Sequence, residues 1–403
     1  MRSALLTLLC FTSAALAANL NLVKEYSGSG FFDEWDYYGH WDDLTNGNVI
    51  FVNKTDSTSL TYVTPSGQAI VAIDNTTFVP ANNPRNAVSI SSQDYFEIGT
   101  VFVIDVARLP WGCSVWPAIW TRGNGDWPAT GEIDIIEGVN RMTFNQMALH
   151  TSPGCSAATG TDQTGSPSAN TDCSPLSGCT VKENKPNSFG DDFNNNGGGV
   201  WAMQFDVSGI FIWFWQRSEI PSSITGASST TGLDISAWGP PSAAWPSGPS
   251  CNISEHVSAQ QLVIDITLCG DWAGLNTTYA QTCDNSTYNA CYLTNVQYQG
   301  TYTDDAYFAI NYIRAFAASN ATVVPESMIN GTSSASGASG ASSTGTPPVT
   351  ISSGASSASS GLSGSPTGGA GSPTQTGGAL GSTYVPAILA GVAGVLVITG
   401  LSF

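Results

Sequence analysis

Short apolar runs rich in Val, Ile, Phe, Tyr and Trp recur from residue 19 to about residue 319, and Gly, Asn, Pro and Ser separate them. Few windows carry apolar residues at helical spacing, so the runs predict strands. The predicted strands are residues 49–52, 59–63, 69–73, 95–106, 133–137, 146–150, 200–207, 209–216, 261–268 and 306–316. This pattern predicts an all-β sandwich, and a span of this length can form one domain when its loops are long.

Composition sets both ends of the chain apart from this domain, which we place at residues 18–319. Residues 1–17 have a basic start and a Leu/Ala-rich run, which indicates a secretory signal peptide. Residues 320–384 are dominated by Ser, Gly, Ala and Thr and predict a flexible, O-glycosylated stalk. Residues 385–403 form an apolar tail with no basic residue after it. The stalk and tail together match a glycolipid (GPI) attachment signal, with a transmembrane anchor as the alternative.

These features predict an extracellular protein held at the outer face of the cell membrane, or in the cell wall, through its GPI anchor. Eight cysteines remain once Cys10 leaves with the signal peptide, so up to four disulfides are expected, with their pairing open. Asn-x-Ser/Thr sequons also fit a secreted chain, and they lie at Asn53, Asn75, Asn252, Asn276, Asn285, Asn320 and Asn330.

Charge and histidine spacing exclude several classes of partner. The formal net charge is −19, which would repel nucleic acid phosphates, so we expect no nucleic-acid partner. The three histidines stand far apart and no Cys-x-x-Cys occurs, so nothing indicates a zinc site. We expect no metal and no cofactor, and a monomer that meets the membrane only through the glycolipid.

Residues 131–138, Gly-Glu-Ile-Asp-Ile-Ile-Glu-Gly, are the most informative motif. Alternation along a strand puts Glu132 and Asp134 on one face and turns Glu137 to the other. A one-residue bulge across Ile135 and Ile136 would return Glu137 to the acidic face, and bulges are common beside active sites. With the bulge, Glu132 and Glu137 are expected at the separation of about 5–5.5 Å that retaining glycoside hydrolysis needs, with Asp134 between them.

Aromatic residues just upstream bear on the choice between a sugar site and an edge strand that carries solvated acids. Trp116, Trp120 and Trp127 lie shortly before Glu132. Flat aromatic rings can pack against the apolar C–H faces of pyranose sugars. Acids and tryptophans in so short a stretch therefore favour a carbohydrate site, with these tryptophans as stacking residues.

The same motif carries a resemblance to a known family. In its bulged Glu-x-Asp-x-x-Glu form, the motif resembles the catalytic signature of glycoside hydrolase family 16, specifically the fungal laminarinase-like endo-1,3(4)-β-glucanase branch. Further matching segments follow one another in order, and they are residues 109–112, 116–120, 148–155, 197–203 and 269–274. The resemblance extends across most of residues 19–318. It implies a β-jelly roll of two curved antiparallel sheets with a substrate cleft on the concave face.

The resemblance also implies roles for residues outside the acidic motif. His150 is expected to hydrogen-bond the sugar, and Arg85 to lie near the sugar site, where a surface arginine is the alternative. Trp272 is expected at the cleft rim on the leaving-group side.

The expected reaction is hydrolysis of a β-glucan, either β-1,3-linked or mixed β-1,3/1,4-linked, with retention of configuration. Glu132 is the expected nucleophile and Glu137 the acid/base, and the charges of Glu132 and Asp134 should raise the pKa of Glu137. Two alternatives stay open. One is a cell-wall glucan transglycosylase that uses the same carboxylates, and the other is a non-catalytic glucan-binding surface protein.

Overall fold

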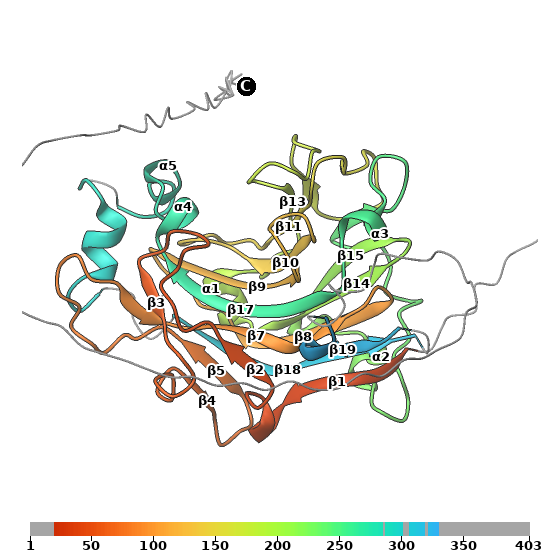
Figure 1. Ribbon diagram of the computed structural model, residues 1–403, viewed down its shortest axis with the longest axis horizontal. Helices are drawn as coiled ribbons and strands as arrows, with labels where there is room; N and C mark the ends of the chain where they lie inside the picture. The colour runs from red at the N-terminus through yellow and green to blue at the C-terminus, as the bar shows by residue number, and fades with distance from the viewer. Residues whose placement is uncertain (1–19, 285–286, 301–305, 319–320, 330–403) are drawn as a thin grey trace, which may run out of the picture. The chain divides into compact units, whose positions relative to one another are not determined.

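The computed structural model describes residues 20–284, 287–300, 306–318 and 321–329. Two large sheets hold most of the strands and pack face to face, as Figure 1 shows. This arrangement confirms the predicted all-β sandwich. The predicted signal peptide, the apolar tail and residues 330–384 of the predicted stalk lie outside the described residues. Residues 321–329 of that stalk are described, and Val323–Pro325 pairs with Ser89–Phe96, so the domain continues past the boundary predicted at residue 319.

The nine-stranded sheet carries the acidic motif. Its strands run in the order β12 (Ser166–Pro167), β13 (Cys179–Lys182), β11 (Gln146–His150), β10 (Glu132–Glu137), β9 (Val115–Gly123), β17 (Gln260–Leu268), β7 (Ser89–Phe96) and β19 (Val323–Pro325), and β2 (Trp35–Tyr37) also pairs with β7. Figure 1 shows this sheet curved, with loops rising at both ends of its open face. The pairs along this order are antiparallel.

The eight-stranded sheet closes the other side of the core. Its order is β16 (Ala243–Pro246), β15 (Gly209–Gln216), β14 (Gly199–Asp206), β8 (Thr100–Arg108), β18 (Tyr307–Ala317), β5 (Ala69–Ala72) and β4 (Thr61–Val63), and β1 (Asn21–Ser27) also pairs with β18. A separate parallel pair joins β3 (Val49–Phe51) to β6 (Arg85–Ala87).

Helices are few and short in the part of the chain that the structure describes. They are α1 (Gly190–Asn195), α2 (Ser222–Thr225), α3 (Ile253–His256), α4 (Gly270–Ala273), α5 (Asn276–Tyr279), α6 (Glu326–Ile329) and the single turns η1 (Gly28–Gly30), η2 (Arg217–Glu219) and η3 (Tyr292–Val296). Within the described ranges, no helix has both the length and the hydrophobicity needed to cross a membrane.

Alternating side chains explain how the strands build the core. On β9, Pro117, Ile119 and Thr121 are buried, while Trp116 and Trp120 on the opposite face are half-buried. The buried face packs with inward residues of both sheets in one hydrophobic cluster. Removing such a face from water is the main source of stability in a sandwich.

Most predicted strands are present, but one predicted run divides into two strands, and several further strands, among them β1, β9, β13 and β16, were not predicted. The run predicted as one strand over residues 95–106 is two strands, β7 and β8, because the chain turns at Gly99, whose φ of +105° is easily adopted only by glycine. Strand β9 was not predicted, because its apolar face is interrupted by a proline and its other face carries tryptophans.

Four disulfides hold the loops around the sheets. They join Cys113 to Cys283, Cys155 to Cys251, Cys173 to Cys179, and Cys269 to Cys291. All eight cysteines beyond Cys10 are therefore paired, which confirms the expected maximum and supplies the pairing that the sequence left open. Cys269 immediately precedes α4, so its bond to Cys291 anchors the loop that presents Trp272.

Candidate active site

The acidic motif lies on the central strand β10, and its pairing shows the predicted bulge. Against β9, Asp134 pairs with Trp120 and Ile136 with Ile119, so Ile135 is the extra residue. The register against β11 shifts over the same interval. Ile133, Ile135 and Ile136 are all buried in the core, whereas Glu132 and Glu137 are half-buried. The bulge thus turns the backbone so that Glu137 faces the same side as Glu132.

Asn145 satisfies the backbone groups that the bulge removes from the ladder. Its amide nitrogen donates to the carbonyl of Ile135 at 2.9 Å, and its amide oxygen accepts from the N–H of Glu137 at 2.9 Å. The side chain is fully buried. Since buried backbone groups need partners, Asn145 fixes the conformation that aims Glu137. Sequence reasoning did not identify this residue.

Each of the two glutamates accepts a hydrogen bond from a tryptophan. Trp127 Nε1 donates to Glu132 Oε2 at 2.8 Å, and Trp116 Nε1 donates to Glu137 Oε1 at 2.9 Å. These N–H groups favour the ionised carboxylates. The structure therefore places both tryptophans beside the acids.

Asp134 lies between the glutamates in sequence and faces His150. The Nε2 atom of His150 is 3.2 Å from Asp134 Oδ2 and 3.9 Å from Glu132 Oε1. The register of β11 explains this contact, because His150 lies directly opposite Glu132. The ring of His150 also packs against Trp127, with ring centroids 5.8 Å apart.

A fourth carboxyl group, Asp265, belongs to the same site and was not predicted. It lies on β17 opposite Ala118 of β9, and Ala118 in turn lies opposite Glu137 of β10. Asp265 Oδ2 accepts from Trp120 Nε1 at 2.9 Å. The available signal was a single acid at the centre of the apolar run 261–268, which is unusual for a strand in the middle of a sheet.

Burial dominates the electrostatics of this carboxyl cluster. It raises the pKa of Glu137 to about 8, and the charge of Asp134 adds to this effect, as predicted. Burial also raises the pKa of Asp134 to about 8, with a contribution from Asp265, and that of Asp265 to about 7. The pKa of Glu132 is raised as well, first by burial and then by Asp134, while His150 and the N–H of Trp127 oppose the shift. The cluster therefore holds protons near neutral pH.

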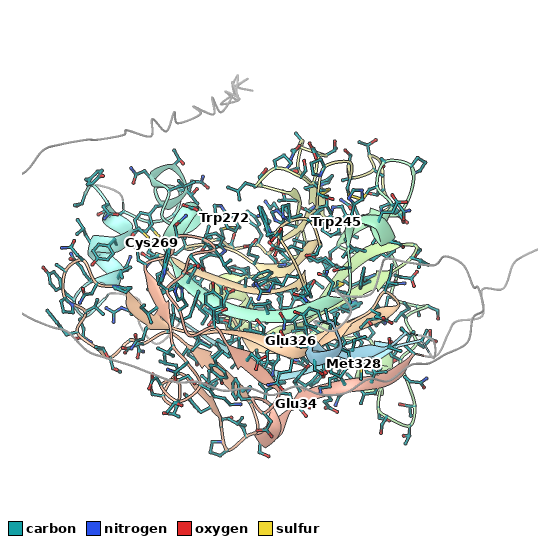
Figure 2. The ribbon with its side chains drawn as sticks, in the orientation of Figure 1. Glu34, Trp245, Cys269, Trp272, Glu326 and Met328 are labelled. Carbon is teal, nitrogen blue, oxygen red and sulfur yellow. A yellow bond between two sulfur atoms is a disulfide. The ribbon has the colours of Figure 1, made fainter. Side chains whose placement is uncertain are left out.

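Trp272 lies on α4 and packs edge-on against Trp116, with ring centroids 5.5 Å apart. Figure 2 shows Trp272 above the open face of the nine-stranded sheet. Trp127 is 49% exposed and offers an accessible ring beside Glu132. The predicted aromatic residues are thus brought to the acid-bearing face.

Arg85 does not belong to this site, and its expected place near the sugar is wrong. The side chain is completely buried. Its guanidinium donates to the backbone carbonyls of Val296, Asp74, Thr77 and Tyr298 at 2.6–3.1 Å. A buried guanidinium needs acceptors for its N–H groups. Arg85 therefore ties β6 to neighbouring loops.

Within the described ranges, the donor atoms of Glu132, Asp134 and His150 all lie within 4.8 Å of one another. This is the only such group of metal-type side chains found there. These are the same atoms that the carboxyl contacts described above involve.

Comparison with known sequences identifies the family. The XgeA-like catalytic GH16 domain matches residues 35–316. The endo-1,3(4)-beta-glucanase xgeA of Emericella nidulans is 38% identical over 268 residues, which cover 65% of this chain and 41% of that protein. A probable endo-1,3(4)-beta-glucanase of Aspergillus niger is 37% identical over 310 residues, which cover 75% of this chain and 40% of that protein. A probable glycosidase of Schizosaccharomyces pombe is 38% identical over 283 residues, which cover 67% of this chain and 64% of that protein. The matches thus span 40–64% of the length of these three relatives.

Solved structures agree with this match. An elongating GH family 16 β-1,3-glucosyltransferase has a TM-score of 0.67 and 34% identity, over 74% of this chain and 100% of that chain. A GH16 laminarinase of Phanerochaete chrysosporium, solved with 6-O-glucosyl-laminaritriose in its donor and acceptor sites, has a TM-score of 0.66 and 32% identity, over 74% and 99%. The chain has the β-jelly-roll fold of these neighbours, and it belongs to glycoside hydrolase family 16, within the XgeA-like group.

Proposed function

We propose that the protein is an endo-β-glucanase that hydrolyses β-1,3- or mixed β-1,3/1,4-glucan with retention of configuration. The observation that carries this proposal is the bulge in β10, which brings Glu132 and Glu137 to one face, each with its own indole N–H donor. Two carboxyl groups in different protonation states are what retaining glycoside hydrolysis requires.

The first step uses both glutamates at once. Ionised Glu132 attacks the anomeric carbon of the glucosyl unit and forms a covalent bond to it, while protonated Glu137 gives its proton to the departing glycosidic oxygen. The raised pKa of Glu137, about 8, keeps that proton available at neutral pH. Burial and Asp134 raise the pKa of Glu132 as well, and His150 together with the indole N–H of Trp127 opposes that rise and so favours the ionised form that attack requires.

The second step returns both residues to their starting states. Ionised Glu137 removes a proton from water, which attacks the anomeric carbon and releases Glu132. Asp134 stays beside Glu132 and in contact with His150 during both steps. Trp120, Trp127 and Trp272 supply the rings on which the glucan lies.

The relatives support a β-glucan as substrate. Of the three relatives described above, one is named an endo-1,3(4)-beta-glucanase and another a probable one, and the P. chrysosporium laminarinase is seen with a branched β-glucan oligosaccharide. The chain shares the catalytic-domain part of such proteins. We therefore extend the β-glucan substrate class to it.

Transglycosylation is the second candidate, and one observation favours it. A structural neighbour of this chain at 34% identity is an elongating β-1,3-glucosyltransferase. The same glycosyl-enzyme would then pass its sugar to another glucan in place of water. Hydrolysis remains the first proposal because the relatives described above include proteins named endo-1,3(4)-beta-glucanases.

We further propose that the protein is secreted, acts as a monomer, and is held at the cell surface by a GPI anchor. Four disulfides support an oxidising compartment. The composition of residues 320–403 supports the anchor.

Digestion of defined β-glucans with sizing of the products tests the activity, and Glu132→Gln is the matched control. The wild type should release short oligosaccharides from β-1,3-glucan, and the variant should bind the same glucan without turnover. If the wild type cleaves none of the β-glucans, the enzyme proposal fails and a binding protein is favoured. If lengthened oligomers dominate at high acceptor concentration, the transglycosylase is favoured.

A further inference from the structure

A pocket of about 330 Å³ lies on the eight-stranded sheet, on the face directed away from the acids. The registers show which face this is. Tyr62 of β4 lies opposite Ile70 of β5, and Tyr307 of β18 lies opposite Ala72 of β5. These side chains share one side of the sheet, while the intervening Val71 is fully buried on the core side.

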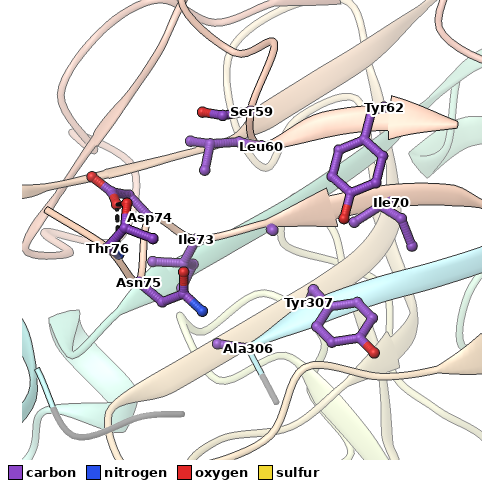
Figure 3. A pocket seen from close by; sticks show the side chains of 11 residues that line it. Ser59, Leu60, Tyr62, Ile70, Ile73, Asp74, Asn75, Thr76, Ala306 and Tyr307 are labelled. Carbon is purple, nitrogen blue, oxygen red and sulfur yellow. Dashed lines mark hydrogen bonds between the residues drawn. The ribbon is translucent and has the colours of Figure 1, made fainter. Parts of the chain in front are cut away.

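Figure 3 shows the two tyrosine rings at one end of the pocket and a polar group at the other. Tyr62 is 47% exposed. The guanidinium of Arg108 lies over the ring of Tyr307, 4.8 Å from its centroid. The rings come from strands with β5 between them, so their backbones stand roughly 10 Å apart. Apolar side chains of Leu60 and Ile73 also line the pocket. Two separated aromatic rings suit the C–H faces of sugar rings, and the polar groups in the same pocket suit the hydroxyl and amide groups of an N-acetylated sugar.

The polar end of the pocket is the sequon Asn75-Thr76-Thr77. The carboxylate of Asp74 accepts hydrogen bonds from the backbone N–H groups of Thr76 and Thr77, and so fixes this turn. Figure 3 shows the amide of Asn75 directed toward the middle of the pocket. The amides of two other sequons, at Asn53 and Asn252, instead donate to carboxylates three residues farther on.

The far end of the same sheet face indicates that this surface needs a cover. There, Trp213 and Trp215 of β15 point outward and are covered by Trp238, with ring centroids 5.2 and 5.0 Å apart. Ile224 and Leu233 complete that cover, and all five side chains are buried. Polypeptide thus protects one end of the face, whereas the tyrosine end is open.

From these observations we infer that Asn75 carries an N-linked glycan whose first N-acetylglucosamine residues lie in this pocket against Tyr62 and Tyr307. The bond forms between Asn75 Nδ2 and C1 of the first sugar, one amide proton is lost, and the diphosphate of a lipid-linked oligosaccharide leaves. The secretory pathway supplies that donor, so this inference rests on the proposed secretion. The glycan covers the open end of the sheet and stabilises the fold.

The test compares three forms of the full chain secreted from a eukaryotic host with high-mannose glycans. Endoglycosidase H leaves one N-acetylglucosamine on each occupied asparagine, and Asn75→Gln leaves none at this position. Mass spectrometry of tryptic glycopeptides should show Asn75 occupied. The trimmed enzyme should keep the melting temperature of the untreated enzyme, and Asn75→Gln should lower it by a few degrees. Asn276→Gln is the matched control, because Asn276 is an exposed sequon that is not among the residues lining the pocket, and it should melt with the wild type.

A double-mutant comparison shows whether the sugar contacts the ring. Tyr62→Ala should lower the melting temperature of the glycosylated enzyme, and should have little further effect in the Asn75→Gln background. Glycans at Asn53 or Asn276 with an unoccupied Asn75 would overturn the inference. A trimmed enzyme with the lower melting temperature of Asn75→Gln would also overturn it, as would fully additive effects of Tyr62→Ala and Asn75→Gln on the melting temperature. Glucan hydrolysis is measured on the same samples and should be unchanged by Asn75→Gln, because the pocket and the acids are on opposite sides, so the activity proposal stands or falls separately.

Discussion

At the scale of single residues, three tryptophans each donate an indole N–H to a different carboxyl group. Trp127 serves Glu132, Trp116 serves Glu137, and Trp120 serves Asp265. The sequence predicted these residues as sugar-stacking rings, because they lie shortly before the acidic motif in the chain. Their hydrogen bonds were not predictable, because they depend on which side chains face each other across strands.

Replacement of two of these tryptophans by phenylalanine should move opposite limbs of the pH profile of kcat/KM. Trp127→Phe removes a donor to ionised Glu132, so the pKa of Glu132 rises and the acid limb moves to higher pH. Trp116→Phe removes a donor to Glu137, so its pKa rises and the alkaline limb moves to higher pH. Each move should be about half a pH unit to one unit. Profiles in which both variants move the same limb would refute these hydrogen-bond assignments.

At the scale of the strand, the bulge in β10 decides where Glu137 points. The spacing of the three acids was enough to predict it, because only an extra residue brings all three to one face. Asn145 was not predictable, since its partners are the backbone groups of Ile135 and Glu137 and not a recognisable side-chain pattern. A buried asparagine that follows the acidic strand looks in sequence like any loop residue.

The variant Asn145→Ala should weaken both the fold and catalysis. Two buried backbone groups lose their partners, at about 1–3 kcal/mol for each group, so the free energy of unfolding should fall by about 2–6 kcal/mol. Misplacement of Glu137 should lower kcat by about 10²-fold. Asn145→Asp keeps the acceptor for the N–H of Glu137, so its free energy of unfolding and its kcat should lie between those of the wild type and Asn145→Ala. Urea denaturation and initial rates measure the two effects, and a destabilised variant with wild-type kcat would show that the bulge keeps its geometry without Asn145.

At the scale of the whole molecule, segments far apart in sequence build the site. The resemblance of ordered motifs predicted the jelly roll and the acid-bearing strand, but not Asp265, which enters from a strand more than a hundred residues later. It also misplaced Arg85, because an arginine at a strand entry gives no sign in the sequence that backbone carbonyls will surround it. Strand pairing and burial, which settle both cases, are properties of the assembled sheets.

The buried carboxyl cluster makes the stability of the whole domain depend on pH. A carboxyl group whose pKa is raised in the folded state favours folding in its protonated form, so stability falls as pH rises from the unfolded value of about 4 toward the folded value. For Asp265 the folded pKa is about 7. The melting temperature of the wild type should therefore fall between pH 5 and pH 8. Asp265→Asn should raise it by a few degrees at pH 8 and change it little at pH 5.

Asp172 provides the control for this measurement. It is exposed, and its hydrogen bonds with Ser174 lower its pKa. Asp172→Asn should therefore not raise the melting temperature at pH 8. Scanning calorimetry at both pH values measures the effects, and an Asp265→Asn variant that follows the wild-type pH dependence would contradict the assigned burial of this charge.

The anomeric configuration of the first product tests the central claim most directly, because it reports how Glu132 and Glu137 cooperate. Proton NMR during the first minutes of hydrolysis of a β-1,3-glucan oligosaccharide should show the β-anomer at the new reducing end before mutarotation, with no signal for Glu132→Gln. Early accumulation of the α-anomer would contradict the assignment of Glu132 as nucleophile and Glu137 as acid/base.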